Sequence, residues 1–311
     1  MPARSFSHNV QHGNWRRRRD QVTHSRYGSG RKASRRGFPV ALILSLSAGS
    51  VFCARSPTEP DKSPPRGELQ RTDMKEDLDA ALATRVFFLH QSVGGNLLDG
   101  VGVLARDTGR EFSLTDLDHP TAGSPGSNWI HAWGGYDPPK RIDKFISIMR
   151  SGLKTDLAFV KFCYLDFGPD ADVADLFAQY QRAITMLKQE RPDVRFAHVT
   201  APLRARSYGI KSLIKRLIGR DRDDLANVKR ADFNKRLLEA FPSDPIFDLA
   251  LRESTRPDGT RETFEYKGQV YYSLVPGYTS DGGHLNERAQ RALAAELIRF
   301  IAQARPLRPP S

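Results

Sequence analysis

The chain has 311 residues, of which 39% are hydrophobic, enough for one domain of ordinary size with extensions. Its net charge is +12, but residues 1–37 hold ten Lys or Arg and one acid, which leaves about +3 for the rest. The part that folds is therefore only mildly basic, and the charge gives no reason to expect a nucleic-acid partner.

The first 54 residues are typical of an export signal. A basic region precedes the uncharged stretch 38–54, which is too short and too interrupted by serine for a good membrane span. Small residues at 48–50 suit signal cleavage. Residues 34–38 resemble a twin-arginine motif, although a chance arginine pair explains them equally well. We expect an exported protein, periplasmic or secreted, and lipidation at Cys53 fits less well because Val and Phe precede it.

A linker rich in proline and charge follows at residues 55–73, and one domain is expected over 74–307. Within this domain the hydrophobic pattern alternates between short apolar runs and helical stripes. Such alternation implies a parallel sheet covered on both faces. We predict an α/β three-layer sandwich with a flavodoxin-like five-stranded parallel sheet. The expected strands are 86–89, 112–117, 157–162, 196–199 and 246–249, and the expected helices are 97–105, 138–149, 173–187 and 285–301.

Two further segments lie outside this minimal fold. Residues 204–222 predict a basic amphipathic helix, which could touch an anionic surface, act as a lid, or simply pack on the domain with a solvated face. Residues 264–272, with Lys267-Gly268 at the centre, predict a β-hairpin that could wall a pocket with Tyr271, Tyr272 or Tyr278.

Ligands of such sheets bind beyond the carboxyl ends of the strands, where the strand order reverses. Residues 90–96 and 163–166 are therefore expected to face the site. Ser92 follows a buried strand and precedes Gly94, Gly95 and a helix, where free N–H groups could stabilise an oxyanion. A simple helix cap is the alternative for Ser92.

A second motif, Asp281-Gly282-Gly283-His284, precedes the last expected helix. A serine nucleophile needs a base, and a histidine base needs an acid that fixes its tautomer. Because this loop follows the fifth strand, it should open on the same sheet edge as Ser92. Taken alone, His284 could be a surface loop residue and Asp281 a helix cap.

Ser92 after the first strand, an acidic block after the third, and Asp-x-x-His before the last helix resemble the SGNH, or GDSL-like, hydrolases over residues 85–303. These are flavodoxin-like esterases and lipases. The resemblance implies Ser92 as nucleophile, His284 as general base and Asp281 as its orienting acid.

The sequence departs from this family at two blocks. The family's Gly-Asp-Ser is His90-Gln91-Ser92 here, and its Gly-x-Asn-Asp is Cys163-Tyr164-Leu165-Asp166, so Leu165 replaces an oxyanion donor. Between these two blocks the family has a further block with a glycine, the second block, and the resemblance implies Gly123 or Gly126 for it here. Asn96 is the first substitute donor to test. The candidates for oxyanion or substrate contacts are His90, Gly94, Asn96, Gly123, Tyr164 and Asp166.

We therefore expect an exported serine hydrolase that needs no cofactor and cleaves a small-molecule or glycan ester, with O-acetyl groups as candidates. The alternative is a non-catalytic glycan-binding protein on the same fold. His90, His119, Asp281 and His284 could in principle hold a metal, but no helical His pair or Cys pair supports one, so no metal site is predicted.

Overall fold

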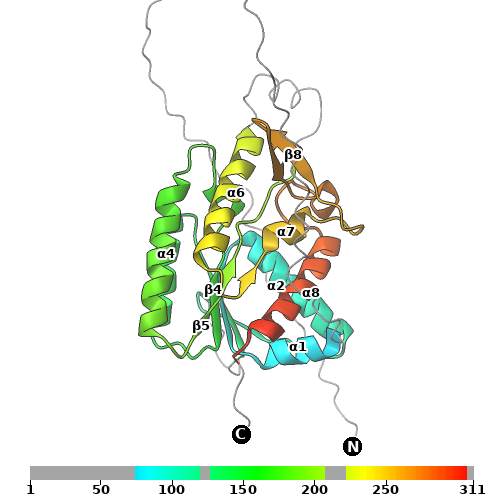
Figure 1. Cartoon of the computed structure of the whole chain (residues 1–311). Coiled ribbons are helices and arrows are strands. Elements are labelled where there is room, and N and C mark those ends of the chain that lie inside the picture. The colour runs from blue at the N-terminus through cyan, green and yellow to red at the C-terminus, as the bar shows by residue number, and fades with distance from the viewer. Residues whose placement is uncertain (1–73, 120–126, 207–221, 307–311) are drawn as a thin grey trace, which may run out of the picture. The chain divides into compact units, whose positions relative to one another are not determined.

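The computed structural model of the protein describes residues 74–119, 127–206 and 222–306 (Figure 1). The predicted leader and linker, Gly123, Gly126 and residues 207–221 of the predicted basic helix lie outside these ranges. No helix within them is long and apolar enough to cross a membrane. The division into leader, linker and domain stays a prediction.

The elements alternate as predicted. In chain order they are α1 (Met74–Ala83), β1 (Val86–His90), α2 (Ser92–Asp107), β2 (Leu114–Asp116), β3 (Trp129–Trp133), α3 (Pro138–Arg150), β4 (Leu157–Val160), η2 (Tyr164–Asp166), α4 (Val173–Glu190), β5 (Arg195–Phe196), β6 (His198–Val199), α6 (Arg222–Ala240), β7 (Ile246–Phe247), α7 (Leu249–Ser254), β8 (Thr263–Tyr266), β9 (Gln269–Tyr272), η3 (Pro276–Tyr278) and α8 (Glu287–Ala304).

The central sheet has five strands in the order β2-β3-β1-β4-β5, and every pair in it is parallel. β6 and β7 form a second parallel pair. Between β5 and β6, the N–H of Ala197 still donates to the carbonyl of Ala158 in β4, at 3.0 Å. The strand order reverses at β1, which lies between β3 and β4. This confirms the predicted α/β class with a flavodoxin-like five-stranded parallel sheet.

Side chains of successive residues point to opposite faces of a strand, and both faces of this sheet are apolar. In β1, Val86 and Phe88 belong to the core beneath α1, α2 and α8, whereas Phe87 and Leu89 belong to the core beneath α3, α4 and α6. Figure 1 shows α4 and α6 on one side of β4 and β5, and α1, α2 and α8 on the other. The predicted three-layer sandwich is confirmed.

The strand beside β1 differs from the prediction. Residues 112–117 were expected to supply the second strand, but only Leu114–Asp116 is extended there, and it lies at the edge of the sheet. The neighbour of β1 is β3, which was not predicted. Its Trp-Ile-His-Ala-Trp sequence places His131 in the buried interior, so it lacks the continuous aliphatic run of a typical buried strand.

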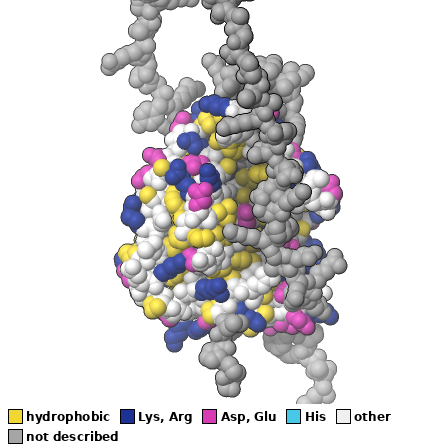
Figure 2. All heavy atoms as spheres, viewed as in Figure 1, with side chains coloured by type: hydrophobic (Ala, Val, Ile, Leu, Met, Phe, Trp, Pro, Cys, Tyr) yellow, Lys and Arg dark blue, Asp and Glu magenta, His cyan; other side chains and the backbone are white. Residues whose placement is uncertain are grey.

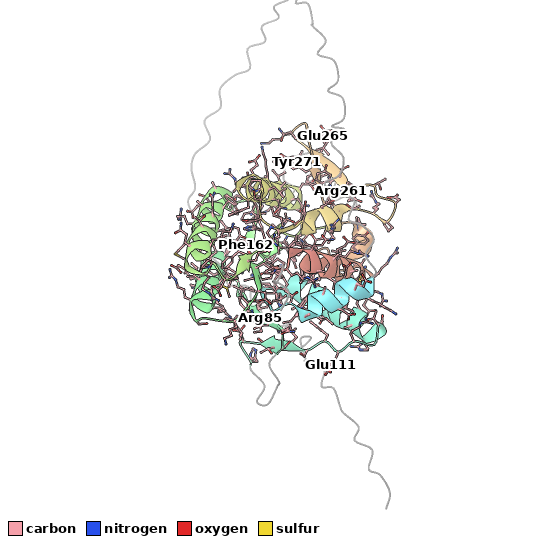
Figure 3. All side chains as sticks on the ribbon, turned by 60° about the horizontal axis from the view of Figure 1, so that its bottom comes forward. Arg85, Glu111, Phe162, Arg261, Glu265 and Tyr271 are labelled. Atoms are coloured by element: carbon pink, nitrogen blue, oxygen red, sulfur yellow. The ribbon has the colours of Figure 1, made fainter. Side chains whose placement is uncertain are left out.

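The predicted hairpin is present as β8 and β9. Lys267 and Gly268 form its two-residue turn, with φ of 50° and 76°, and positive φ at both positions is the rule in tight hairpin turns. Both strands contact α6. Figure 3 shows Glu265 and Tyr271 together near the hairpin end of the domain, apart from Phe162 in the interior.

The surface of the described part agrees with its mild net charge. On the face seen in Figure 2, Lys and Arg side chains alternate with Asp and Glu, and apolar side chains lie between them. Most charged side chains there are paired or solvated, as on an ordinary protein surface.

Candidate active site

Ser92 is the first residue of α2, directly after the turn that leaves β1. Gln91 is the N-cap residue, with extended backbone, and no side chain caps this helix. Ser92 is half-buried, and its hydroxyl makes no hydrogen bond with any described residue. The helix-cap alternative therefore fails. The hydroxyl lies at a helix N-terminus, where the first N–H groups have no partner within the helix.

The first turn of α2 rests on His90. A Cβ on Gly94 would lie 2.4 Å from the Cβ of His90, so only glycine allows this close approach. The N–H of Gly94 donates to the carbonyl of Gln91 at 2.7 Å. Gly94, predicted as a contact for oxyanion or substrate, thus packs the nucleophile turn onto the ring beneath it.

The tautomer of His90 follows from its two partners. Its Nδ1 lies 3.0 Å from the carbonyl of Gln91, so this nitrogen must carry the proton, because a carbonyl can only accept. Its Nε2 then accepts from Nδ1 of His131 at 3.1 Å. Burial lowers the pKa of His90 to about 3 and also lowers that of His131. The two rings form a neutral pair below Ser92.

Asp281 and His284 form a hydrogen-bonded pair, as the motif predicts. Nδ1 of His284 lies 2.5 Å from Oδ2 of Asp281. Oδ1 of Asp281 accepts the N–H groups of Gly283 at 3.0 Å and of His284 at 2.8 Å. Partial burial raises the pKa of Asp281, but the hydrogen bonds from the backbone and ring of this loop outweigh it and hold the pKa well below its ordinary value. Asp281 is therefore a carboxylate at neutral pH.

Asn96 connects this loop to α2. It lies four residues after Ser92, on the same face of α2. Its Oδ1 accepts the N–H of Leu285, the residue after His284, at 3.1 Å. Asn96 was predicted as a substitute oxyanion donor, and the structure gives it a role in holding the acid–base loop over the face that carries Ser92.

Ser92 and His284 themselves are not hydrogen-bonded. Among the described residues, the partner of His284 Nε2 is the hydroxyl of Tyr164, at 3.4 Å. Nucleophile–base hydrogen bonds are often loose in enzymes without substrate and tighten when substrate binds. The side chains of His284 and Asp281 are 42% and 46% exposed, so the imidazole is accessible from solvent.

The block after β4 places its four residues in different environments. Asp166 forms an ion pair with Arg141, and both side chains are buried, at 3% and 0% exposure. Its Oδ2 also accepts the N–H of Cys163 at 2.6 Å. Leu165 is 63% exposed, and the ring of Tyr164 is buried. Asp166, predicted to contact oxyanion or substrate, is thus engaged by the protein's own arginine.

Arg141 and the loop after β3 are site residues that the sequence did not reveal. Arg141 donates from Nε to the carbonyl of Gly134 at 3.2 Å and from a terminal nitrogen to that of Gly135 at 3.0 Å. Gln91, beside Ser92, donates to the same Gly135 carbonyl at 3.1 Å. The two glycines directly after an aromatic-rich run are the signal that could have found this loop.

Gly135 follows Gly134 in the same loop and adopts a backbone conformation that few other residues tolerate. Its φ of 70° lies in the left-handed region that favours glycine. Its N–H has no partner among the described residues. Gly134 donates its own N–H to the carbonyl of His90 at 2.7 Å, which fixes the loop beside the end of β1.

The residues considered as a metal alternative do not converge. His119 contacts Asp116 at 3.2 Å, whereas His90 contacts His131. Across residues 74–119, 127–206 and 222–306, no group of three or more His, Cys, Asp or Glu side chains could hold a metal ion. Cys163 is a buried free thiol.

Comparison with known proteins identifies similar solved structures. No family model and no curated protein matches the chain. It is similar to a GDSL-like lipase from Bacteroides thetaiotaomicron, at 13% identity and a TM-score of 0.43, over 74% of this chain and 97% of that one. It is also similar to an acetyl xylan esterase, at 14% identity and a TM-score of 0.41, over 68% of this chain and 96% of that one. A third similar structure is an aryl esterase from M. smegmatis, at 14% identity and a TM-score of 0.41, over 71% of this chain and 100% of that one.

Proposed function

We propose that the protein is a serine hydrolase that cleaves an ester. The observation that carries this proposal is the state of His284: Nδ1 donates to the carboxylate of Asp281, so Nε2 carries the lone pair that can accept a proton. Asn96 holds this loop over the face of α2 that carries Ser92. A base of fixed tautomer, on a loop held over the face that carries an unengaged serine hydroxyl, supports nucleophilic catalysis.

In the proposed reaction, Oγ of Ser92 attacks the ester carbonyl and its proton passes to Nε2 of His284. The oxyanion is stabilised by the N–H of Ser92 and by the N–H of Gly135, the glycine that shares the Gln91 contact. His284 then protonates the leaving oxygen, and the acyl group stays on Ser92. A water molecule then attacks the acyl carbon and gives a proton to His284. His284 returns this proton to Oγ of Ser92 as the bond between Ser92 and the acyl group breaks and the acid leaves.

We propose further that the substrate is a small acyl ester on a glycan, with an O-acetyl group as the candidate. Tyr136 supports this, because it is 85% exposed next to Gly135 and meets Trp133 edge to face, at 5.9 Å between ring centres. An exposed aromatic face beside the site suits stacking against a sugar ring. The second candidate, a glycan-binding protein without catalysis, is favoured by the missing Ser92–His284 hydrogen bond and by Leu165.

The test is hydrolysis of 4-nitrophenyl acetate by the purified protein. Ser92→Ala and His284→Ala should each reduce turnover to background, because a catalytic triad acts as a unit. The matched controls are Ser147→Ala and His119→Ala. Both residues are exposed and lie outside the Asp281–His284 loop, so these variants should leave turnover unchanged. Full activity in Ser92→Ala contradicts the nucleophile. A wild-type protein that binds acetylated glycan without hydrolysing any ester favours the binding protein.

A further inference from the structure

Tyr164 places a hydroxyl at the one atom of His284 that the reaction uses. Its oxygen lies 3.4 Å from Nε2, and its ring meets the imidazole edge to face, with the ring centres 5.8 Å apart and an interplanar angle of 79°. Because Nδ1 carries the proton that binds Asp281, Nε2 is an acceptor. The Tyr164 hydroxyl is therefore the donor.

The position of Tyr164 is fixed by three contacts. Arg230, buried in α6, donates from two nitrogens to the Tyr164 carbonyl at 3.1 and 2.6 Å. The guanidinium of Arg204 lies 5.5 Å from the centre of its ring. On the other side, the ring occupies the space where Gly283 lacks a side chain: a Cβ there would lie 2.7 Å from the ring. The hydroxyl thus belongs to a rigid site.

Two groups this close can bind one oxygen atom together. An oxygen about 2.8 Å from each fits between partners 3.4 Å apart, and the side chain of His284 is open enough to admit it. In ester hydrolysis, the oxygen beside Nε2 is first that of the leaving alcohol and then that of the attacking water. The carbonyl oxygen instead points to the N–H groups that stabilise the oxyanion.

We propose that Tyr164 is a catalytic residue that donates a hydrogen bond to the leaving-group oxygen while His284 protonates it, and afterwards to the attacking water. This inference rests on the proposed serine hydrolase. The acyl carbon–oxygen bond breaks, the Ser92 proton reaches the alcohol through Nε2, and Tyr164 keeps its own proton. Burial raises the pKa of Tyr164 to about 12, so the phenol remains a donor throughout.

The experiment compares two acetate esters that differ only in the leaving group. In 4-nitrophenyl acetate the leaving oxygen is stable without help, whereas in ethyl acetate it is strongly basic. Tyr164→Phe should lower kcat/KM for ethyl acetate by about 10- to 100-fold, the range expected for a hydrogen bond to a charged group. It should lower kcat/KM for 4-nitrophenyl acetate far less. Tyr180→Phe, which removes a tyrosine hydroxyl from another buried histidine, His198, is the matched control and should leave the ratio of the two values unchanged.

The ratio of the two values in one sample does not depend on how much of the variant is folded. If Tyr164→Phe lowers kcat/KM for both esters equally, or lowers it for neither, the ratio is unchanged and the proposal is overturned. If Tyr164→Phe yields no folded protein, 3-fluorotyrosine at position 164 keeps the ring and makes a stronger donor, and it should shift the ratio in favour of ethyl acetate. A wild-type protein that hydrolyses neither ester contradicts the proposed function itself.

Discussion

His90, at the end of β1 beneath the turn that carries Ser92, is held in its neutral form by burial. His90 is buried, donates from Nδ1 to Gln91 and accepts at Nε2 from His131. Protonated His90 would carry a proton on both nitrogens, and the contact with His131 would then bring two donors together. The nucleophile turn therefore depends on a neutral ring. The sequence predicted His90 as a contact for the oxyanion or substrate, and its hydrogen bonds instead join it to Gln91 and His131.

This pair makes stability depend on pH. The pKa of His90 is about 3 in the folded protein and about 6.5 when unfolded, so between these values only the unfolded state takes up the proton. The contribution of neutral His90 to the free energy of unfolding should be fully present above pH 6.5. It should fall by about 1.4 kcal/mol per pH unit below that value, or about 2 kcal/mol by pH 5. The lowered pKa values of His131 and His198 act in the same direction, whereas burial raises the pKa of Glu253 to about 8, which acts in the opposite direction.

Urea unfolding at pH 7.5, 6, 5 and 4.5 measures this slope. His90→Gln should flatten it, because glutamine does not titrate. His119→Gln, a control at a side chain that is 78% exposed, should leave it as in the wild type. An equally steep slope in His90→Gln would assign the effect to other groups. Asp281 does not contribute to the slope in this pH range, since its contribution to stability is lost only as pH falls below about 4.

At the scale of elements, Arg141 of α3 joins the two loops that flank the nucleophile turn. It binds the carbonyls of Gly134 and Gly135 after β3 and the carboxylate of Asp166 after β4. A guanidinium has enough donors in a fixed plane to serve these partners at once, which an ammonium group cannot do. We expect Arg141 to fix the loop whose Gly135 N–H serves the proposed oxyanion.

Arg141→Met should destabilise the protein by about 3–5 kcal/mol, because Asp166 is then buried without its partner. The double variant Arg141→Met with Asp166→Leu should recover part of this loss in stability. Its turnover should stay low, since the loop then loses both Arg141 contacts and keeps only the hydrogen bond from Gln91 to the Gly135 carbonyl. Arg150→Met, which removes an exposed ion pair with Glu190, should cost less than about 1 kcal/mol. Recovery of both stability and turnover in the double variant would contradict the role in holding the loop.

The same elements explain what the sequence could predict. α3, α4 and α8 carry apolar stripes at helical spacing and were expected from them. The buried face of α6 instead carries polar residues, which hide its amphipathic pattern. Some of these residues hold the site, as Arg230 does for Tyr164. The buried polar residues of α6 are Asp224, Asn227, Arg230 and Asn234.

The candidate site divides in the same way. The Asp281–His284 pair could be predicted because both residues lie in one short loop, and its hydrogen bond is present. Arg141 and Gly135 could not, because their roles depend on contacts between α3, the loop after β3 and the loop after β4. Tyr164 was predicted among the candidate donors, but its approach to Nε2 requires the missing Cβ of Gly283, which no pattern along the chain reveals.

At the scale of the whole molecule, positive charge is concentrated at one end of the chain. Residues 1–37 account for +9 of the net charge of +12, and an uncharged stretch follows at 38–54. The described ranges begin only at residue 74 and contain Ser92, Asp281 and His284. We infer that the basic segment directs export and takes no part in the proposed chemistry, so its removal should leave ester hydrolysis intact.

Expression of the full chain in a bacterial host, followed by mass spectrometry of cell fractions, measures export directly. The exported protein should lack residues 1 to about 50, because signal segments are cleaved at small residues such as those at 48–50. If the twin-arginine motif is used, Arg35→Lys with Arg36→Lys should block export, whereas the control Arg16→Lys with Arg17→Lys should not, since it keeps the motif and the charge. Export of the Arg35, Arg36 variant at the wild-type level would assign the leader to the general secretion route. Uncleaved protein confined to the cytoplasm would contradict export by either route, because the cleavage enzyme acts only on chains that have reached the membrane.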